Sequence, residues 1–367
     1  MKRITIIGGG LAGLTLGIGL RKAGSPVAVW EAGRYPRHRV CGEFISGRGQ
    51  EALGRLGLLG TFNRAGAILA HSARFMFEQA STPVRQLPTP AMCMSRFSLD
   101  ALLAEEFQQL GGELRAGERW RETNVGEGVV RASGRQAQPQ EGGWRWFGLK
   151  VHARNISLAA DLEMHARRDG YVGLSRLPGG EVNVCGLFRA GAHPGSVWSG
   201  RQKPNDGTEL ELRAPREKGE TRGWLRLLCG EPTSRLQSRL EEAVFDEDSF
   251  CSVAGLSFRP QRAAGRTDCC IGDALTMTPP ATGNGMSMAF EGAELALSPL
   301  TAWSRNEISW PDAQEVVARA CDSAFGRRLS WARWLQWMMF TPAMQTWFGA
   351  VPLHSEWLWQ TMFARTR

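Results

Sequence analysis

Three glycines near the N-terminus have a spacing that suits a dinucleotide. Gly8, Gly10 and Gly13 form G-x-G-x-x-G between an apolar run, 4–7, and a helically spaced run, 11–22. Glycine at these positions lets the backbone approach a pyrophosphate, whose charge the helix N-terminus attracts. Glu31 ends the next apolar run, where its carboxylate can accept hydrogen bonds from both hydroxyls of an adenosine ribose. The pattern predicts a Rossmann-type site; a turn selected only for tight packing is the alternative.

A second motif distinguishes FAD from NAD, which share the same ADP half. Residues 271–274 read Ile-Gly-Asp-Ala after an apolar strand, and residues 279–286 lead into a helix that begins near Ser287. Asp273 can accept a hydrogen bond from a ribityl hydroxyl, and amides at the helix start can stabilise negative charge on a reduced flavin. NAD has neither group, so the sequence predicts FAD.

At these residues the chain resembles the flavoprotein superfamily of p-hydroxybenzoate hydroxylase, geranylgeranyl reductases and flavin-dependent halogenases. The resemblance spans nearly the whole chain, and its other elements are the run 39–46 and Ser95-Arg96. The Cys-Gly-Glu sequence within that run is most similar to the geranylgeranyl reductase-like branch. The resemblance implies an α/β fold, in which a Rossmann-like, glutathione reductase-type FAD-binding domain holds an intercalated antiparallel-sheet substrate domain and precedes a helical C-terminal segment.

The resemblance also implies where the cofactor lies. Arg39 and Arg96 would contact its ribityl–pyrophosphate portion, and Cys41 would lie beside the flavin ring and the substrate cavity. A buried, inert thiol is the alternative for Cys41. The predicted cofactor-binding residues are Gly8, Gly10, Leu11, Ala12, Gly13, Glu31, Ala32, Arg39, Val40, Cys41, Gly42, Arg96, Gly134, Gly272, Asp273, Pro280, Gly283, Asn284, Gly285 and Met286.

Two departures from the family pattern affect the expected chemistry. Ala132-Ser133-Gly134 stands where hydroxylases usually have Ala-Asp-Gly, so an aspartate linked to nicotinamide binding is missing. Residues 171–176 stand where halogenases have W-x-W-x-I-P and lipid reductases have Y-x-W-x-F-P, and only the tyrosine remains. Small residues there should enlarge or reshape the cavity above the flavin. Because the residues of the halogenase motif are replaced, we expect no halogenation. The predicted substrate cavity is lined by Cys41, Tyr171, Gly173 and Ser175.

Periodicity predicts the other elements. Alternating residues in 71–94 and 146–188 indicate strands of one antiparallel sheet, and 98–110 and 224–245 indicate amphipathic helices. Residues 194–223 have the composition of a loop. The expected division is 1–70, 95–145 and 255–300 for the FAD-binding domain, 71–94 and 146–254 for the substrate domain, and 301–367 for a Trp-rich helical segment.

Composition indicates which binding partners and which cellular compartment to expect. The net charge is +8, but the arginines are scattered, which argues against nucleic acid. Eight cysteines without zinc spacing, and a strand that begins almost at Met1, predict no metal and a cytoplasmic protein. For the tryptophans of 330–363 core packing is the first interpretation; a lipophilic tunnel or a peripheral membrane contact is the other.

The sequence therefore predicts an FAD-dependent oxidoreductase of secondary metabolism, a monooxygenase or a reductase. Its expected substrate is a hydrophobic polyketide, isoprenoid or aromatic compound, changed by hydroxylation or C=C reduction. NAD(P)H would visit transiently as electron donor, or an external reductase would supply the electrons. No catalytic residue is assigned. A flavin-binding module without turnover is the alternative.

Overall fold

The computed structural model describes residues 1–78, 80–122, 126–138, 140–191, 223–341, 344 and 355–366. Five parallel strands form one sheet, in the order β13 (Cys269–Cys270), β7 (Val129–Arg131), β1 (Ile4–Ile7), β2 (Val27–Glu31) and β6 (Glu113–Ala116). The chain passes from β1 through helix α1 (Leu11–Lys22) to β2, which is the βαβ unit predicted from the glycine turn. β1 and α1 are largely buried because apolar residues fill both.

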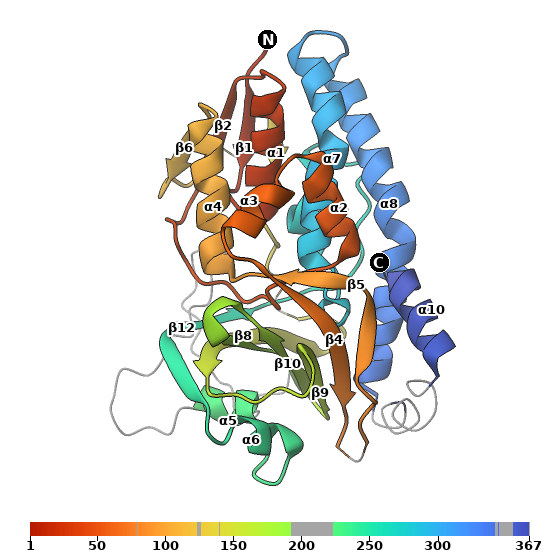
Figure 1. Ribbon diagram of the computed structural model, residues 1–367. Coiled ribbons are helices and arrows are strands. Elements are labelled where there is room, and N and C mark those ends of the chain that lie inside the picture. Colours follow the sequence, from red (N-terminus) through yellow and green to blue (C-terminus); the bar gives the residue numbers. More distant parts are fainter. Residues whose placement is uncertain are drawn as a thin grey trace.

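Eight strands form a second sheet below the first in Figure 1. Residues 71–94 and 146–188 contribute strands to this one sheet, as predicted. The neighbouring strands are antiparallel except for β4 and β9, which pair in parallel. The order is β12 (Val244–Ala254), β8 (Trp144–Arg154), β11 (Val182–Gly191), β10 (Gly170–Arg176), β9 (Leu162–Arg167), β4 (Ile68–Met76), β5 (Arg85–Cys93) and β3 (Phe44–Ile45).

Helices pack around the parallel sheet and extend along the second one (Figure 1). α1 contacts α4 (Arg96–Gln109) and α7 (Gly285–Ser304), and Gly17 allows the close approach because a Cβ there would lie 2.9 Å from the Phe107 ring. α8 (Trp310–Met339) reaches the second sheet. There α10 (Glu356–Thr366) packs against α8. The shorter helices are α2 (Gly47–Arg55), α3 (Leu59–Arg64), α5 (Gly223–Cys229) and α6 (Arg235–Leu240). The predicted fold class is confirmed.

The predicted helix over 224–245 is wrong. α5 ends at Cys229, α6 starts at Arg235, and β12 begins already at Val244. Gly230 between the two helices has a φ of 84°, a left-handed conformation that stops a helix and that glycine adopts at little cost. The predicted loop 194–223 lies outside the described residues except for Gly223, and the domain boundaries stay a prediction.

The tryptophans of the C-terminal segment divide between the interior and the surface. Trp359 is buried and its ring lies 5.8 Å from that of Phe75, so core packing holds for this residue. Trp334, Trp337 and Trp357 are 43%, 58% and 70% exposed. Among the described residues, no helix is both long enough and apolar enough to pass through a lipid bilayer.

Candidate active site

A cavity of about 1610 Å³ lies between the two sheets. The glycine turn after β1 lines one side, and residues of β8, β10, β11 and α10 line the other. Pockets for single small ligands usually measure about 300–1,000 Å³. The cavity is therefore large enough for two ligands that meet inside it.

The three glycines of the turn have different surroundings. Gly8 has a φ of 109°, and a Cβ there would lie 2.2 Å from the Ala132 carbonyl oxygen. A Cβ on Gly13 would lie 1.9 Å from the Gly8 carbonyl oxygen, so both positions require glycine for packing. Gly10 lines the cavity, and a Cβ there would meet no atom of a described residue within 4 Å. α1 starts directly after Gly10 without a side-chain cap, so its first amides remain for a pyrophosphate.

Glu31 keeps room for a ribose hydroxyl. Its Oε1 accepts hydrogen bonds from the Gly33 amide at 2.8 Å and from Arg37 at 2.6 Å. Its Oε2 accepts one from the Gly9 amide at 2.9 Å. A carboxylate has about four acceptor positions and these bonds use three, so one remains; Glu31 lines the cavity, and the Arg39 guanidinium lies 3.7 Å from Oε2. The residues thus fit an adenosine. The sequence analysis did not predict that Arg37 would hold the Glu31 carboxylate.

Asp100 holds the two arginines predicted to contact the cofactor. Arg96 donates to both oxygens of the Asp100 carboxylate, at 2.7 and 2.9 Å, and Arg39 donates to one of them at 3.1 Å. Asp100 is fully buried, whereas both guanidinium groups border the cavity. The arginines are therefore fixed in place before any ligand binds, an arrangement that suits phosphate oxygens. The four-residue spacing of Arg96 and Asp100 on one helix could have indicated this pair.

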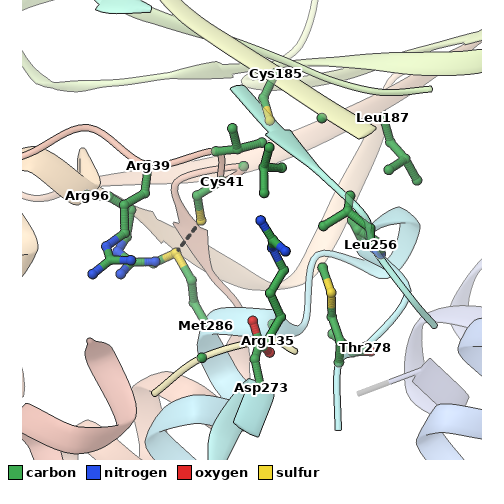
Figure 2. A pocket seen from close by; sticks show the side chains of 18 of the residues that line it. Arg39, Cys41, Arg96, Arg135, Cys185, Leu187, Leu256, Asp273, Thr278 and Met286 are labelled. Carbon is green, nitrogen blue, oxygen red and sulfur yellow. Dashed lines mark hydrogen bonds between the residues drawn. The ribbon is translucent and has the colours of Figure 1, made fainter. Parts of the chain in front are cut away.

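Asp273 faces the cavity from the short turn Gly272–Ala274 (Figure 2). Its side chain is exposed to the open cavity, while desolvation by the protein around the carboxyl group raises its pKa to about 6, although Arg96 and Arg135 favour the charged form. Arg135, which follows the altered Ala-Ser-Gly sequence, extends into the cavity from beside Asp273 (Figure 2). The sequence prediction missed Arg135 because a single arginine after a turn carries no distinctive pattern.

Most of the predicted cofactor residues line the cavity, and three do not. Gly13 and Gly272 serve packing, since a Cβ on Gly272 would lie 2.9 Å from the Cβ of Ala12. Asn284 turns away: its Oδ1 accepts from Ser46 at 3.1 Å and its amide donates to the Thr366 carbonyl. Those that line it are Gly8, Gly10, Leu11, Ala12, Glu31, Ala32, Arg39, Val40, Cys41, Gly42, Arg96, Gly134, Asp273, Pro280, Gly283, Gly285 and Met286.

The four residues predicted for the substrate side all border the cavity. Ser175 donates to the Gly42 carbonyl oxygen at 2.8 Å and so joins β10 to the loop that carries Cys41. The Cys41 thiol lies 3.2 Å from the sulfur of Met286, and burial raises its pKa (Figure 2). A thiol that stays protonated is a poor nucleophile, which favours the inert interpretation of Cys41.

A buried charged cluster behind this loop was not predicted. The Glu43 carboxylate lies 2.6 Å from His152 Nε2 and 3.4 Å from Lys150 Nζ, and all three side chains are buried. Lys150 Nζ is also 3.0 Å from His38 Nδ1; burial and this ammonium lower the pKa of His38 to about 4. Glu43 and His38 border the cavity. Lys150 and His152 are two positions apart on β8, so the sequence predicts that they share one face of the strand. It could not indicate Glu43 as their partner, because Glu43 is more than 100 positions away.

Comparison with known proteins identifies the N-terminal part of the chain. Residues 1–153 match the family model described as FAD binding domain. This part of the chain is therefore similar to FAD-binding domains. No curated protein matches the chain at a significant level.

Solved structures extend the likeness to the whole chain. The flavin-dependent brominase Bmp2 has a TM-score of 0.70 and 16% identity, covering 100% of this chain and 95% of its own. PqsL from Pseudomonas aeruginosa, described as a probable FAD-dependent monooxygenase, has a TM-score of 0.66 and 16% identity, covering 94% of this chain and 99% of its own. A flavoprotein/dehydrogenase from Cytophaga hutchinsonii has a TM-score of 0.70 and 13% identity, covering 95% and 89%. At these identities the likeness establishes the fold. The geranylgeranyl reductase-like branch is supported by neither result and stays a prediction.

Proposed function

We propose that the protein is an FAD-dependent oxidoreductase that oxygenates a hydrophobic small molecule with electrons from NAD(P)H. The observation that carries the proposal is the continuity of the cavity: one space is bordered by the pyrophosphate turn at Gly10 and by the apolar face of β10 and β11. Bound FAD would accept a hydride from NAD(P)H and would then activate oxygen. The similar structures include proteins titled as an FAD-dependent monooxygenase and as halogenases, which supports oxygen chemistry over simple binding.

The chain's own residues bind the cofactor and exclude water. Gly10 and the first amides of α1 would hold the pyrophosphate, and Glu31 would hold the adenosine ribose. Arg39 and Arg96, fixed by Asp100, would add positive charge near the phosphates. On the other side of the cavity, apolar side chains of the second sheet and of α10 would keep the reacting region dry, which protects reactive species from water.

The experiment uses FAD-loaded protein with NADH or NADPH, ¹⁸O₂ and a panel of polyketide, isoprenoid and aromatic compounds. Mass spectrometry should find a product that carries one ¹⁸O atom, and free FAD at the same concentration should give none. A product that gains two hydrogens without ¹⁸O would replace oxygenation by C=C reduction. If NAD(P)H does not reduce the bound FAD and an added flavin reductase yields no product either, the protein is a flavin-binding module and the proposal fails.

A further inference from the structure

We infer that the Tyr171 hydroxyl donates a hydrogen bond to an oxygen acceptor, such as a ketone carbonyl, on an otherwise apolar substrate. The inference rests on the proposed function in one respect, namely that the apolar part of the cavity receives the substrate. It names the polar group by which that substrate is recognised.

The hydroxyl of Tyr171 is buried without a partner. The residue is 5% exposed, and no described residue hydrogen-bonds its hydroxyl. The chain contains two tyrosines, and the other one, Tyr35, donates to the Gly9 carbonyl oxygen. A buried polar group without a partner costs roughly 1–3 kcal/mol. Because Tyr171 lines the cavity, a ligand bound there can supply the missing partner.

The strand register leaves open space beside Tyr171. Gly173 is two residues further along β10, on the same face, and it pairs with Cys185 of β11. Among the described residues, a Cβ on Gly173 would meet only two backbone oxygens, at 3.7 and 3.9 Å, so none of these residues fills the position next to the tyrosine. Cys185 points into the cavity from the neighbouring strand (Figure 2).

The surroundings of the ring are apolar. Tyr171 belongs to a buried cluster that also contains Leu187, Leu256, Phe258 and Phe340, and Leu187 and Leu256 border the cavity (Figure 2). A hydrocarbon or aromatic body can lie against these side chains without losing a polar contact. The hydroxyl is then the polar group that fixes the orientation of such a ligand.

The protonation state of the hydroxyl allows it to donate a hydrogen bond. Burial raises the pKa of Tyr171 well above its usual value, and it does the same for the Cys185 thiol. Both groups are therefore protonated at neutral pH, one as a hydroxyl donor and the other as a weak thiol donor. A ketone, ester or ether oxygen complements this pair.

A ligand pair and a variant test the inference without turnover. The probes are 2-acetylnaphthalene and its hydrocarbon counterpart 2-isopropenylnaphthalene, titrated calorimetrically into FAD-loaded protein. The wild-type protein should bind the ketone about fivefold to tenfold more tightly, as expected for one net hydrogen bond. Tyr171→Phe should abolish this preference and leave hydrocarbon binding unchanged. A ketone preference that survives in Tyr171→Phe, or a wild-type protein without any preference, overturns the inference.

Stability gives a second readout that needs no ligand. Tyr171→Phe removes an unpartnered hydroxyl and should raise the melting temperature of the ligand-free protein, whereas Tyr35→Phe removes a formed hydrogen bond and should lower it. If both variants lower it, Tyr171 already has a partner and the inference fails. A positive result in both tests together with no oxygenated product would refute the proposed function alone.

Discussion

Glu43 and His152, which are 109 positions apart in the chain, lie with a carboxylate oxygen and Nε2 only 2.6 Å from each other in the interior. Glu43 also accepts a hydrogen bond from the Arg96 amide at 2.8 Å. Its φ of 58° is rare for a residue other than glycine and persists only where the surroundings hold it. These contacts join the loop that carries Cys41 and Gly42 to β8 of the second sheet, so they position one wall of the cavity.

Removing the charge of Glu43 should therefore destabilise the protein. Glu43→Gln leaves the buried Lys150 ammonium without its carboxylate, and we expect the free energy of unfolding to fall by roughly 3 kcal/mol. Urea denaturation measures it. Glu181→Gln, a half-buried control on the other side of His152, should cost less than about 1 kcal/mol. If both variants lose the same free energy of unfolding, the buried cluster contributes no more to stability than the half-buried ion pair of Glu181.

Two glycines of the turn should separate folding from cofactor binding. Gly10→Ala adds a methyl group that meets only the cavity, so the protein should fold normally but bind FAD more weakly. Gly8→Ala places a Cβ 2.2 Å from a carbonyl oxygen at a left-handed φ and should cost roughly 1–3 kcal/mol or more. Flavin absorbance per protein and melting temperature are the two measurements. Normal FAD content in a folded Gly10→Ala variant would contradict the assigned pyrophosphate position.

Asp273 should give the FAD-free protein a distinctive pH dependence. Its pKa is about 6 in the folded protein and 3.8 in the unfolded chain, so the folded state binds more protons between these values. This carboxyl group therefore makes stability fall as pH rises from about 4 to 6. Asp273→Asn should remove that fall, which thermal denaturation at several pH values can show.

Asp248, which is exposed on β12, offers the matched control. Asp248→Asn should still show the fall in stability that Asp273 causes between about pH 4 and 6. A stability difference between wild type and Asp273→Asn that stays the same at every pH would mean that this carboxyl group does not titrate in that range.

Filling the space at Gly173 should impair the substrate side alone. Gly173→Trp puts a large side chain into the cavity, so ligand binding and activity should decrease while FAD content stays normal. Gly173→Ala is the control, because its methyl group makes only ordinary contacts. Loss of FAD from the tryptophan variant would make the position structural, and full activity would place the substrate elsewhere.

We also expect no halogenation, although similar structures include halogenases. Gly173, Ser175 and Arg176 replace the residues of the W-x-W-x-I-P motif. The flavin-loaded protein with bromide, a reductant and an aromatic panel should give no brominated product by mass spectrometry. A brominated product that depends on the folded protein would falsify this expectation.

The sequence by itself determined the local parts of the proposed cofactor site. The glycine turn and Glu31 follow from constraints within one βαβ unit, where backbone geometry permits few residue types. The same holds for Asp273 at a turn that leads into a helix, and for the alternation that placed Tyr171, Gly173 and Ser175 on one face of a strand.

Only the tertiary structure decided which distant side chains meet. Asn284 occupies the expected helix start, yet its side chain bonds to Ser46 and to the backbone of α10 instead of facing the cavity. Glu43 contacts Lys150 and His152 because the loop after β2 packs against β8. Periodicity assigns a residue to a face of its own element, but the partner on that face is set by how the elements pack, where burial forces charged groups to pair.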